Sequence, residues 1–249
     1  MRTSLLLTLL LSLLSLPAWA DEQVLRFYGY AYDLKSNRYL YTEVHQQHLS
    51  DGRWVGGTMT YYDPQGRRIG FKTLDFARDP AIPLYHLTLD LTGYEEGIDD
   101  IGDTLSLFKR HARGEPLERA SVARGDATAA DSGFHAYIRQ HFAELMAGQT
   151  LNFRLVAAGN LDAYKFRIRR IDDTRFEDAP AVRLKVEPDS LLRFVVDPLE
   201  LTYDPQSRKL LEYRGISNIH DSSGNPYTVR IDYYRQPPAD APKALLPLP

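Results

Sequence analysis

Hydrophobic and polar residues alternate along most of this chain, with the two-residue period of a β-strand that buries one face. The alternation occupies residues 25–30, 38–42, 59–62, 69–74 and 84–89, where tyrosine and β-branched residues are frequent. It returns at 151–155, 164–168, 182–186 and 227–233, and further apolar runs cover 191–196, 199–203 and 209–216. The pattern predicts about a dozen short strands.

A seven-residue pattern that occurs twice predicts two hairpin tips. Residues 62–68 read Tyr-Asp-Pro-Gln-Gly-Arg-Arg, and residues 203–209 read Tyr-Asp-Pro-Gln-Ser-Arg-Lys. In each copy the Asp side chain can accept hydrogen bonds from the backbone of the turn, while the Pro fixes φ at the next position. Shorter turn signals at 35–37 and 50–52 also suit hairpins. An antiparallel up-and-down meander is therefore expected.

One helix is predicted, and a loop precedes it. Residues 114–131 contain few large apolar side chains and are rich in Ala, Arg, Gly and Asp, which predicts a mobile loop. Asp131 or Ser132 is expected to cap the helix, and Gly148 to end it. The apolar face of the helix would consist of Phe134, Ile138, Phe142, Leu145 and Met146.

The dimensions of these elements favour a curved sheet. A helix of about 16 residues is only ~24 Å long, so it cannot cover a dozen strands spaced ~4.8 Å apart. The sheet must curl on itself or split into packed layers. We therefore expect a mainly β protein. It would be one large curved antiparallel sheet, a half-barrel or open barrel, with one main α-helix packed on it, forming a single domain over residues 21–235. Curling would leave a hollow for a ligand.

The two ends of the chain differ from this pattern. Residues 1–20 carry one cation, Arg2, then a leucine-rich run and a small-residue site ending at Ala20, which is typical of a secretory signal peptide. Residues 236–249 are rich in proline, which predicts a disordered tail. No later stretch approaches the ~20 apolar residues of a transmembrane helix, so no transmembrane span is expected.

Composition narrows the setting and the partners. The chain contains no cysteine, so it can form no disulfide and carry no lipidated thiol. Its formal net charge of −3 argues against binding to nucleic acid. The sequence therefore predicts a protein of the periplasm, or a secreted one, released by cleavage near Ala20.

Several segments carry a resemblance to known proteins. They are the two hairpin tips, residues 147–154 (Ala-Gly-Gln-Thr-Leu-Asn-Phe-Arg) and residues 201–205 followed by 214–219 (Arg-Gly-Ile-Ser-Asn-Ile). They resemble uncharacterised secreted proteins of Gram-negative bacteria, a domain-of-unknown-function family, over most of the chain. This resemblance implies no known activity. More loosely, the expected fold is similar to periplasmic lipoprotein-carrier half-barrels, whose concave face holds acyl chains.

Two groups of residues are candidates for ligand binding. Tyrosines of the first strands would line the hollow with their phenol groups: Tyr28, Tyr30, Tyr32, Tyr39 and Tyr41. The alternative is ordinary packing of aromatic residues in a sheet. Cations between the apolar positions of later strands would lie on the outer face: Arg154, Arg167 and Arg169, with Lys165, Arg183 and Lys185. They suit anionic headgroups or phosphates, or form a solvated face only.

Other polar groups give no catalytic or metal assignment. His45 and His48 are three apart in a strand, which sets them on opposite faces. The acidic run from Glu95 to Asp103 lacks the spacing of a calcium loop and is expected to be a solvated loop. Ser217, His220 and Asp221 lie too close in sequence for a typical triad and suit a turn. No cofactor is implied. Two carboxylates meeting across the hollow, as in glycoside hydrolysis, stay an alternative.

Three functions follow from these expectations. The first is a non-catalytic envelope protein that shelters an apolar or amphipathic, lipid-like molecule. The second is a hydrolase acting on an envelope glycan or ester. The third is an interaction module that docks on another envelope protein through residues 114–131 or the proline-rich tail.

Overall fold

A computed structural model describes residues 22–190 and 197–234. The predictions for residues 1–20, 191–196 and 236–249 therefore lie outside the described residues. The first half of the described chain forms eight strands: β1 Glu22–Asp33, β2 Tyr39–Ser50, β3 Arg53–Tyr62, β4 Arg68–Asp75, β5 Leu84–Leu89, β6 Glu95–Ile101, β7 Thr104–Arg110 and β8 Glu118–Ala123.

The second half begins with a short strand and two short helices and then returns to strands. The elements are β9 Thr128–Ala130, α1 Phe134–Gln140, α2 Phe142–Met146, β10 Leu151–Ala157, the 3-10 turn η1 Ala158–Asn160, β11 Asp162–Phe176, β12 Ala179–Pro188, β13 Leu199–Tyr203, β14 Leu210–His220 and β15 Pro226–Tyr234. None of the helices in the described ranges is long and apolar enough to cross a membrane.

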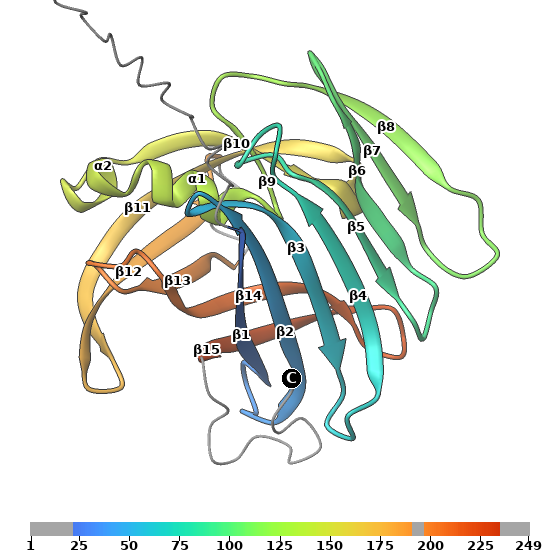
Figure 1. Ribbon diagram of the computed structural model, residues 1–249, viewed down its shortest axis with the longest axis horizontal. Coiled ribbons are helices and arrows are strands. Elements are labelled where there is room, and N and C mark those ends of the chain that lie inside the picture. Colours follow the sequence, from blue (N-terminus) through green and yellow to red (C-terminus); the bar gives the residue numbers. More distant parts are fainter. Residues whose placement is uncertain (1–21, 191–196, 235–249) are drawn as a thin grey trace, which may run out of the picture.

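All fifteen described strands belong to one sheet. Nearly every strand pairs antiparallel with its neighbours in sequence, β1 pairs with β15, and β8 and β9 form the two edges. The exception is β9, which lies parallel to β10. The sheet curves round without closing through hydrogen-bonded strands (Figure 1). The prediction of a large, curved, open antiparallel sheet is confirmed.

Both predicted hairpin tips are present, between β3 and β4 and between β13 and β14. Asp63 Oδ1 accepts from the backbone N–H groups of Gln65 and Arg67 at 2.9 and 3.0 Å. Asp204 Oδ1 accepts from those of Gln206 and Ser207 at 2.9 and 2.7 Å. These side-chain bonds satisfy turn donors locally, which is why the tips could be recognised from sequence.

Half of the segment predicted to be a loop is strand. Within residues 114–131, β8 pairs with β7 and β9 pairs with β10, so the loop prediction is wrong there. Small residues suit these positions because β9 is completely buried. The small side chains of β9 were interpreted as a sign of a loop, although they are needed for burial.

The predicted single helix is two short helices. The break falls at His141, and the expected cap residues do not cap, since Gly133 precedes α1 without a side-chain hydrogen bond. A Cβ at Gly133 would lie 2.2 Å from the carbonyl oxygen of Ala81, so the chain passes too close to its neighbour for another residue. The buried side chains Ile138, Phe142 and Leu145 still pack as the periodicity predicts.

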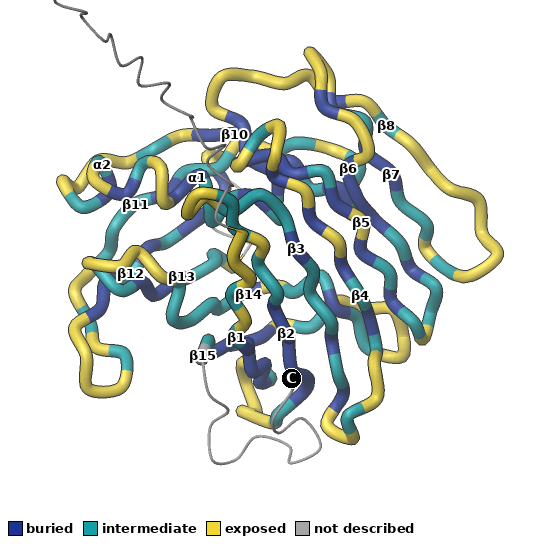
Figure 2. The backbone as a smooth tube through the Cα atoms, in the orientation of Figure 1, coloured by how far each residue is buried: buried dark blue, intermediate teal, exposed yellow. Residues whose placement is uncertain are grey.

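The core lies on the concave side, where the two arms of the sheet face each other. The larger cluster joins side chains of β4 to β7, such as Leu74 and Leu107, to Leu184 and Leu201 of β12 and β13. A second cluster lies around Tyr41 and Ile231. Figure 2 shows burial alternating along many strands, as a sheet with one dry face requires.

Candidate functional site

Seven polar residues meet inside the curved sheet and form what we call the interior cluster. They come from four strands or their ends and from the segment between β9 and α1: Lys72, Tyr85, Tyr94, Glu96, Asp131, Ser132 and Asn218. Because Asn218 follows Glu96 by 122 positions, only the curvature of the sheet brings these groups together.

Strand register explains why charged side chains face inward here. Lys72 pairs with Leu87, and Leu87 pairs with Glu96, so the three form one row across β4, β5 and β6. Leu87 is fully buried, Lys72 is 5% exposed and Glu96 is 2% exposed. Their strand neighbours Thr73 and Glu95 point to the opposite face.

Glu96 accepts two hydrogen bonds. The Tyr94 hydroxyl donates to Oε2 at 2.6 Å, and Asn218 Nδ2 donates to Oε1 at 2.6 Å. The 3-10 turn lies directly against the carboxyl group, because a Cβ at Gly159 would be 2.3 Å from Oε2. The Glu96 side chain is therefore held in one position.

Asp131 is held beside Glu96 through a shared donor. Asn218 Nδ2 also donates to Asp131 Oδ2 at 3.2 Å, and the Tyr85 hydroxyl donates to the same oxygen at 3.0 Å. The backbone of Asp131 donates to the carbonyl of Val156 at 3.0 Å, which anchors the segment on β10. One amide nitrogen thus bridges two carboxyl groups.

Lys72 supplies the positive charge of the cluster. Its ammonium donates to Ser132 Oγ at 3.2 Å and lies 5.3 Å from the centre of the Tyr85 ring. A buried ammonium is stabilised by such a ring and by nearby carboxylates. The charge of Lys72 also acts on Glu96.

Burial raises the pKa of Glu96, and the neighbouring charge of Asp131 raises it further, against the opposing effects of Lys72, Tyr94 and Asn218. Burial also raises the pKa of the Tyr85 and Tyr94 hydroxyls, with Asp131 and Glu96 adding to the effect. Both phenols therefore stay protonated and can donate, while Glu96 retains a proton more readily than an exposed glutamate.

Further polar pairs continue along the concave side. The hydroxyls of Tyr41 and Ser217 are 2.7 Å apart, and His45 Nε2 lies 2.9 Å from Glu43 Oε2. His135 Nδ1 lies 2.8 Å from the Tyr203 hydroxyl, and burial, with repulsion from Arg139 and His45, lowers the pKa of His135 to about 3. The interior is therefore half polar.

The cluster has a buried end and an end that solvent reaches. Lys72 and Glu96 are buried, whereas Asp131 and Asn218 are only half-buried. Met59 and Tyr213 also face inward, are half-buried and touch both core clusters. Half-buried polar donors and acceptors beside apolar side chains can hold the polar end of an amphipathic molecule.

The five tyrosines predicted to line the hollow are divided between the two faces. Tyr30 pairs with Asp232 and Thr42, while Tyr41 pairs with inward-facing Ala31. Tyr28, Tyr30 and Tyr32 form a separate cluster, against which Tyr39 packs, and Tyr41 alone faces the concave side. A bulge beside Tyr32 brings Tyr39 across from it. The expectation of one continuous tyrosine surface is therefore wrong.

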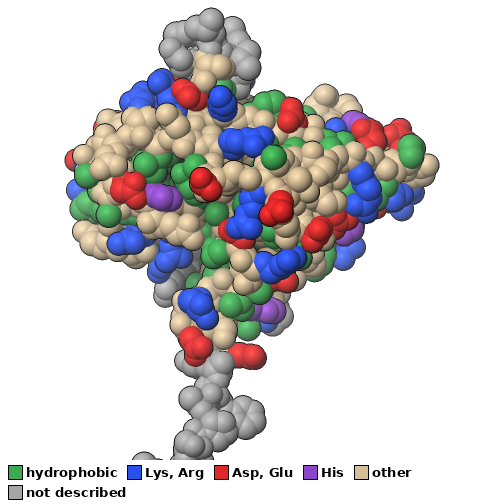
Figure 3. Space-filling model, turned by 90° about the horizontal axis from the view of Figure 1, so that it is seen from above, with side chains coloured by type: hydrophobic (Ala, Val, Ile, Leu, Met, Phe, Trp, Pro, Cys, Tyr) green, Lys and Arg blue, Asp and Glu red, His purple; other side chains and the backbone are tan. Residues whose placement is uncertain are grey.

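The predicted cationic residues lie on β10 to β12, but much of their charge is paired. Glu187 lies 2.6 Å from Arg167, 2.8 Å from Lys185 and 3.9 Å from Arg169. Arg183 bonds to Asp172. Figure 3 likewise shows acidic and basic side chains interspersed over the face it presents. The arrangement resembles the solvated, aggregation-resistant face that was the alternative.

Arg154 has a structural contact instead. Its Nη1 donates to the carbonyl oxygen of Ala123 at 3.0 Å, and its backbone N–H donates to that of Ala127 at 2.8 Å. The first bond joins β10 to the end of β8, and the second joins it to the residue that precedes β9, so the edges of the open sheet approach each other here. Arg154 therefore links β10 to the edge strand β8.

The remaining candidates lie as follows. His45 is buried and His48 exposed, on opposite faces as expected. Asp221 accepts from the turn N–H groups of Ser223 and Asn225, while Ser217 bonds to Tyr41, so no hydrogen bond joins them as a triad. No group of three or more potential ligands in the described residues is arranged to hold a metal ion.

Sequence reasoning missed the interior cluster. The acidic run was expected to be a solvated loop, yet most of it is strand β6 with Glu96 inside. The sequence contained one signal. Glu95 and Glu96 are adjacent, and in a strand one of two adjacent side chains must point inward. Asp131 was taken for a helix cap, and nothing local connects Lys72 or Asn218 with either acid.

Comparison with known proteins supports the fold. No family model matches the sequence, and no curated protein matches it significantly. Among solved structures, a β-barrel-like protein of a domain-of-unknown-function family, DUF1849, from Brucella abortus is similar, with a TM-score of 0.50 and 7% identity. The alignment covers 87% of this chain and 96% of that one. At this identity the likeness concerns the β-barrel-like fold alone.

Proposed function

We propose that this protein is a non-catalytic binding protein of the bacterial envelope that holds an amphipathic molecule on the concave side of its sheet. The observation that carries the proposal is the interior cluster. Burying Lys72 and Glu96 costs free energy that an apolar row would not. Charged groups kept inside a fold at such a cost are typical of binding sites.

The chemistry of the cluster favours a ligand with hydrogen-bond donors at its polar end. Asp131 and Asn218, at the half-buried end, offer carboxylate and amide oxygens. Two carboxyl groups against one ammonium disfavour an anionic headgroup. A hydroxyl or amine group would suit Asp131, while the apolar part of the molecule would lie against Met59 and Tyr213.

The setting of this function is part of the proposal. The leader-like residues 1–20 favour export, and the absence of cysteine is compatible with an oxidising compartment. Detection of the protein in a periplasmic extract, with an N-terminus near Asp21 by mass spectrometry, would support this location.

Competition against a fluorescent apolar probe tests the ligand class. N-phenyl-1-naphthylamine should gain fluorescence on binding, and dodecanol or dodecylamine should displace it at lower concentration than dodecanoate. Stronger displacement by dodecanoate, or no binding of the probe, would contradict the proposal. Native mass spectrometry of gently purified protein should also show an adduct of low mass.

Neighbouring residues provide a matched pair of variants. Glu96→Gln alters the inward carboxyl group and should weaken displacement by dodecylamine about 10-fold, because Glu96 shares the donor Asn218 with Asp131 and so helps to hold the group that binds the amine. Glu95→Gln changes the same chemistry on the outer face and should leave displacement unchanged. Equal effects of the two substitutions would exclude a role for the interior cluster.

One observation favours a second candidate, an envelope hydrolase. Glu96 and Asp131 share the donor Asn218, so their bonded oxygens are at most about 6 Å apart, within the range of paired catalytic carboxyl groups. The raised pKa of Glu96 suits a general acid. Release of 4-nitrophenol from glycoside or ester substrates, abolished by Glu96→Gln and not by Glu95→Gln, would favour this function.

A further inference from the structure

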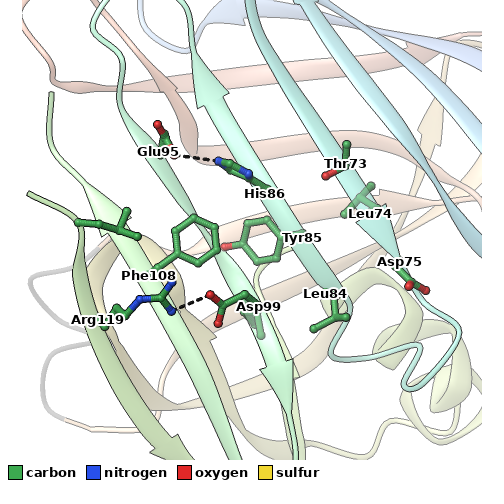
Figure 4. A pocket seen from close by; sticks show the side chains of 12 residues that line it. Thr73, Leu74, Asp75, Leu84, Tyr85, His86, Glu95, Asp99, Phe108 and Arg119 are labelled. Atoms are coloured by element: carbon green, nitrogen blue, oxygen red, sulfur yellow. Dashed lines mark hydrogen bonds and ion pairs between the residues drawn. The ribbon is translucent and has the colours of Figure 1, made fainter. Parts of the chain in front are cut away.

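A separate depression lies on the outer face of the sheet, over β4 to β8. It has a volume of about 430 Å³, within the range of small-molecule sites, and its lining is mostly apolar. Figure 4 shows its side chains, which include Thr73, Asp75, His86, Asp99 and Phe108. It shares one residue with the interior cluster, Tyr85, whose hydroxyl bonds to Asp131, while none of the other six cluster residues lines it.

A glycine creates the floor of this depression. Thr73, His86, Gly97, Phe108 and Arg119 form one row across five strands. A Cβ at Gly97 would lie 2.6 Å from the Phe108 ring and 2.0 Å from the carbonyl oxygen of Tyr85, so the ring folds down over the bare backbone. An aromatic face is thereby placed on the outer side of the sheet.

Two polar pairs flank the aromatic ring. His86 Nε2 lies 3.0 Å from Glu95 Oε2, and the imidazole meets the Phe108 ring edge-on, with ring centres 5.1 Å apart. On the other side Arg119 Nη1 donates to Asp99 Oδ2 at 2.6 Å. Figure 4 shows both pairs as dashed lines beside Phe108. The walls are therefore polar, while Leu84 and Leu117 add apolar surface.

The charges of the lining are unequal. Three carboxylates, Asp75, Glu95 and Asp99, face one permanent cation, Arg119. Glu95 is also near Arg110, at 3.6 Å, and Asp99 is bonded to Arg119. Among the described residues Asp75 has no ion pair and accepts only the backbone N–H of Ala77 at 2.9 Å. The depression thus has an excess of negative charge, with Asp75 available.

A cationic side chain of the protein, Arg119, already lies over the Phe108 ring. The guanidinium carbon of Arg119 lies 5.9 Å from the centre of the Phe108 ring, within cation–π distance. Arg119 is more than half exposed, so it can leave at little cost. A ligand cation could take its place over the ring and beside Asp99.

We propose that this depression binds a small organic cation with a flat apolar body. The body would lie against Phe108 and Leu84, and the cationic group would interact with Asp75 or, after Arg119 swings out, with Asp99. An anion of the same shape is disfavoured, because it would meet three carboxylates. The site requires no movement of the sheet, since its floor and walls are strands.

A pair of probes of opposite charge tests the proposal. Tryptamine and indole-3-acetate share an indole ring, but the first carries an ammonium group and the second a carboxylate. Titration of each into the full-length protein, followed by calorimetry and by ligand NMR line broadening, should show saturable binding of tryptamine at least 10-fold tighter than that of indole-3-acetate. Equal binding of the two, or binding of neither, would overturn the proposal.

Variants locate the site and report on its chemistry. Asp75→Asn changes an exposed side chain and should weaken tryptamine binding by roughly 3- to 10-fold, and Phe108→Leu should weaken it by a similar factor. Arg119→Gln should strengthen it, because it frees the ring and Asp99. A purely structural role of Arg119 would not produce tighter binding.

The same variants separate this site from the proposed function. Glu96→Gln acts on the opposite face and should leave tryptamine binding unchanged, while Asp75→Asn should leave displacement of the apolar probe by dodecylamine unchanged. If Glu96→Gln abolished tryptamine binding and Asp75→Asn did not, the cation would be bound inside, and the outer site would be refuted.

Discussion

The two faces of β4 to β6 hold charge in different ways, although the residues concerned lie on the same strands. On the inner face Lys72 and Glu96 are buried, and each is held by neutral partners, Ser132 for the first, Tyr94 and Asn218 for the second. On the outer face Glu95 is hydrogen-bonded to His86 and Asp99 forms an ion pair with Arg119, and both partners are exposed. The inner charges are costly and fixed, whereas the outer ones are weakly held and exchangeable.

The contrast extends to protonation. Burial and Asp131 raise the pKa of Glu96. Burial acts on Asp99 in the same direction, but hydrogen bonds from Ser106 and Arg119 outweigh it and lower the pKa of Asp99. An inner carboxyl group with a raised pKa and an outer one with a lowered pKa suit different ligands, a hydrogen-bonding polar end inside and a cation outside.

The largest effect is expected from Lys72→Met. Removing the ammonium leaves Glu96 and Asp131 without a nearby cation, which should lower the free energy of unfolding by about 3 kcal/mol at pH 8 and by less at pH 5, where Glu96 can take up a proton. Urea denaturation at both pH values measures this. Thr73→Met, its outward neighbour, should change stability by less than about 0.5 kcal/mol. Similar losses in both variants would remove the contrast between the faces.

A somewhat smaller effect is expected from Gly97→Ala. The added methyl group would meet the Tyr85 carbonyl and the Phe108 ring, so strands must shift, at a cost of about 2 kcal/mol. Gly102→Ala is the control, since a Cβ there has no neighbour closer than 3.7 Å. Thermal unfolding compares the two, and a neutral Gly97→Ala would show that the outer floor is not tightly packed.

The pH dependence of stability should distinguish the neighbouring glutamates. Because the folded-state pKa of Glu96 lies above its unfolded value of 4.5, its contribution favours folding at low pH and is lost as pH rises through the folded pKa. Glu96→Gln should remove this decline, so the variant should be more stable than the wild type at pH values above the folded pKa. Glu95→Gln should retain the wild-type slope. Parallel curves for wild type and Glu96→Gln would contradict the inner assignment.

The smallest effect is expected from Arg119→Ala. The side chain is about half exposed, so loss of its ion pair with Asp99 should cost less than about 1 kcal/mol, and the cost should shrink further in 0.5 M salt. Denaturation at two salt concentrations checks this. A large, salt-independent loss would mean that Arg119 is part of the packed structure and is not exchangeable.

Local signals were sufficient for much of the fold. Strands such as β4 and β5 follow from alternation, and the tips at Asp63 and Asp204 from side-chain bonds within a few residues. Where local signals misled, tertiary contacts were decisive. The small residues of β9 are strand because they are buried against β10, and the helix breaks at His141 although its apolar face is continuous.

The candidate site was beyond the reach of local signals. Arg154 looked like one of several surface cations, but the approach of the two sheet edges gives it a bond to Ala123. Asp131 looked like a helix cap, but the close passage at Gly133 moves the helix start and turns Asp131 toward Tyr85 and Asn218. Both outcomes depend on segments that meet only after the sheet has curled.

By itself the sequence determined that this protein is a wide antiparallel sheet with too little helix to cover it, because alternation and turn chemistry act over a few residues. The tertiary structure alone decided which polar groups share the interior, because a one-residue change of register exchanges the two faces of a strand. Glu96 meets Asn218, and Phe108 lies over Gly97, only through the register of strands across the curved sheet.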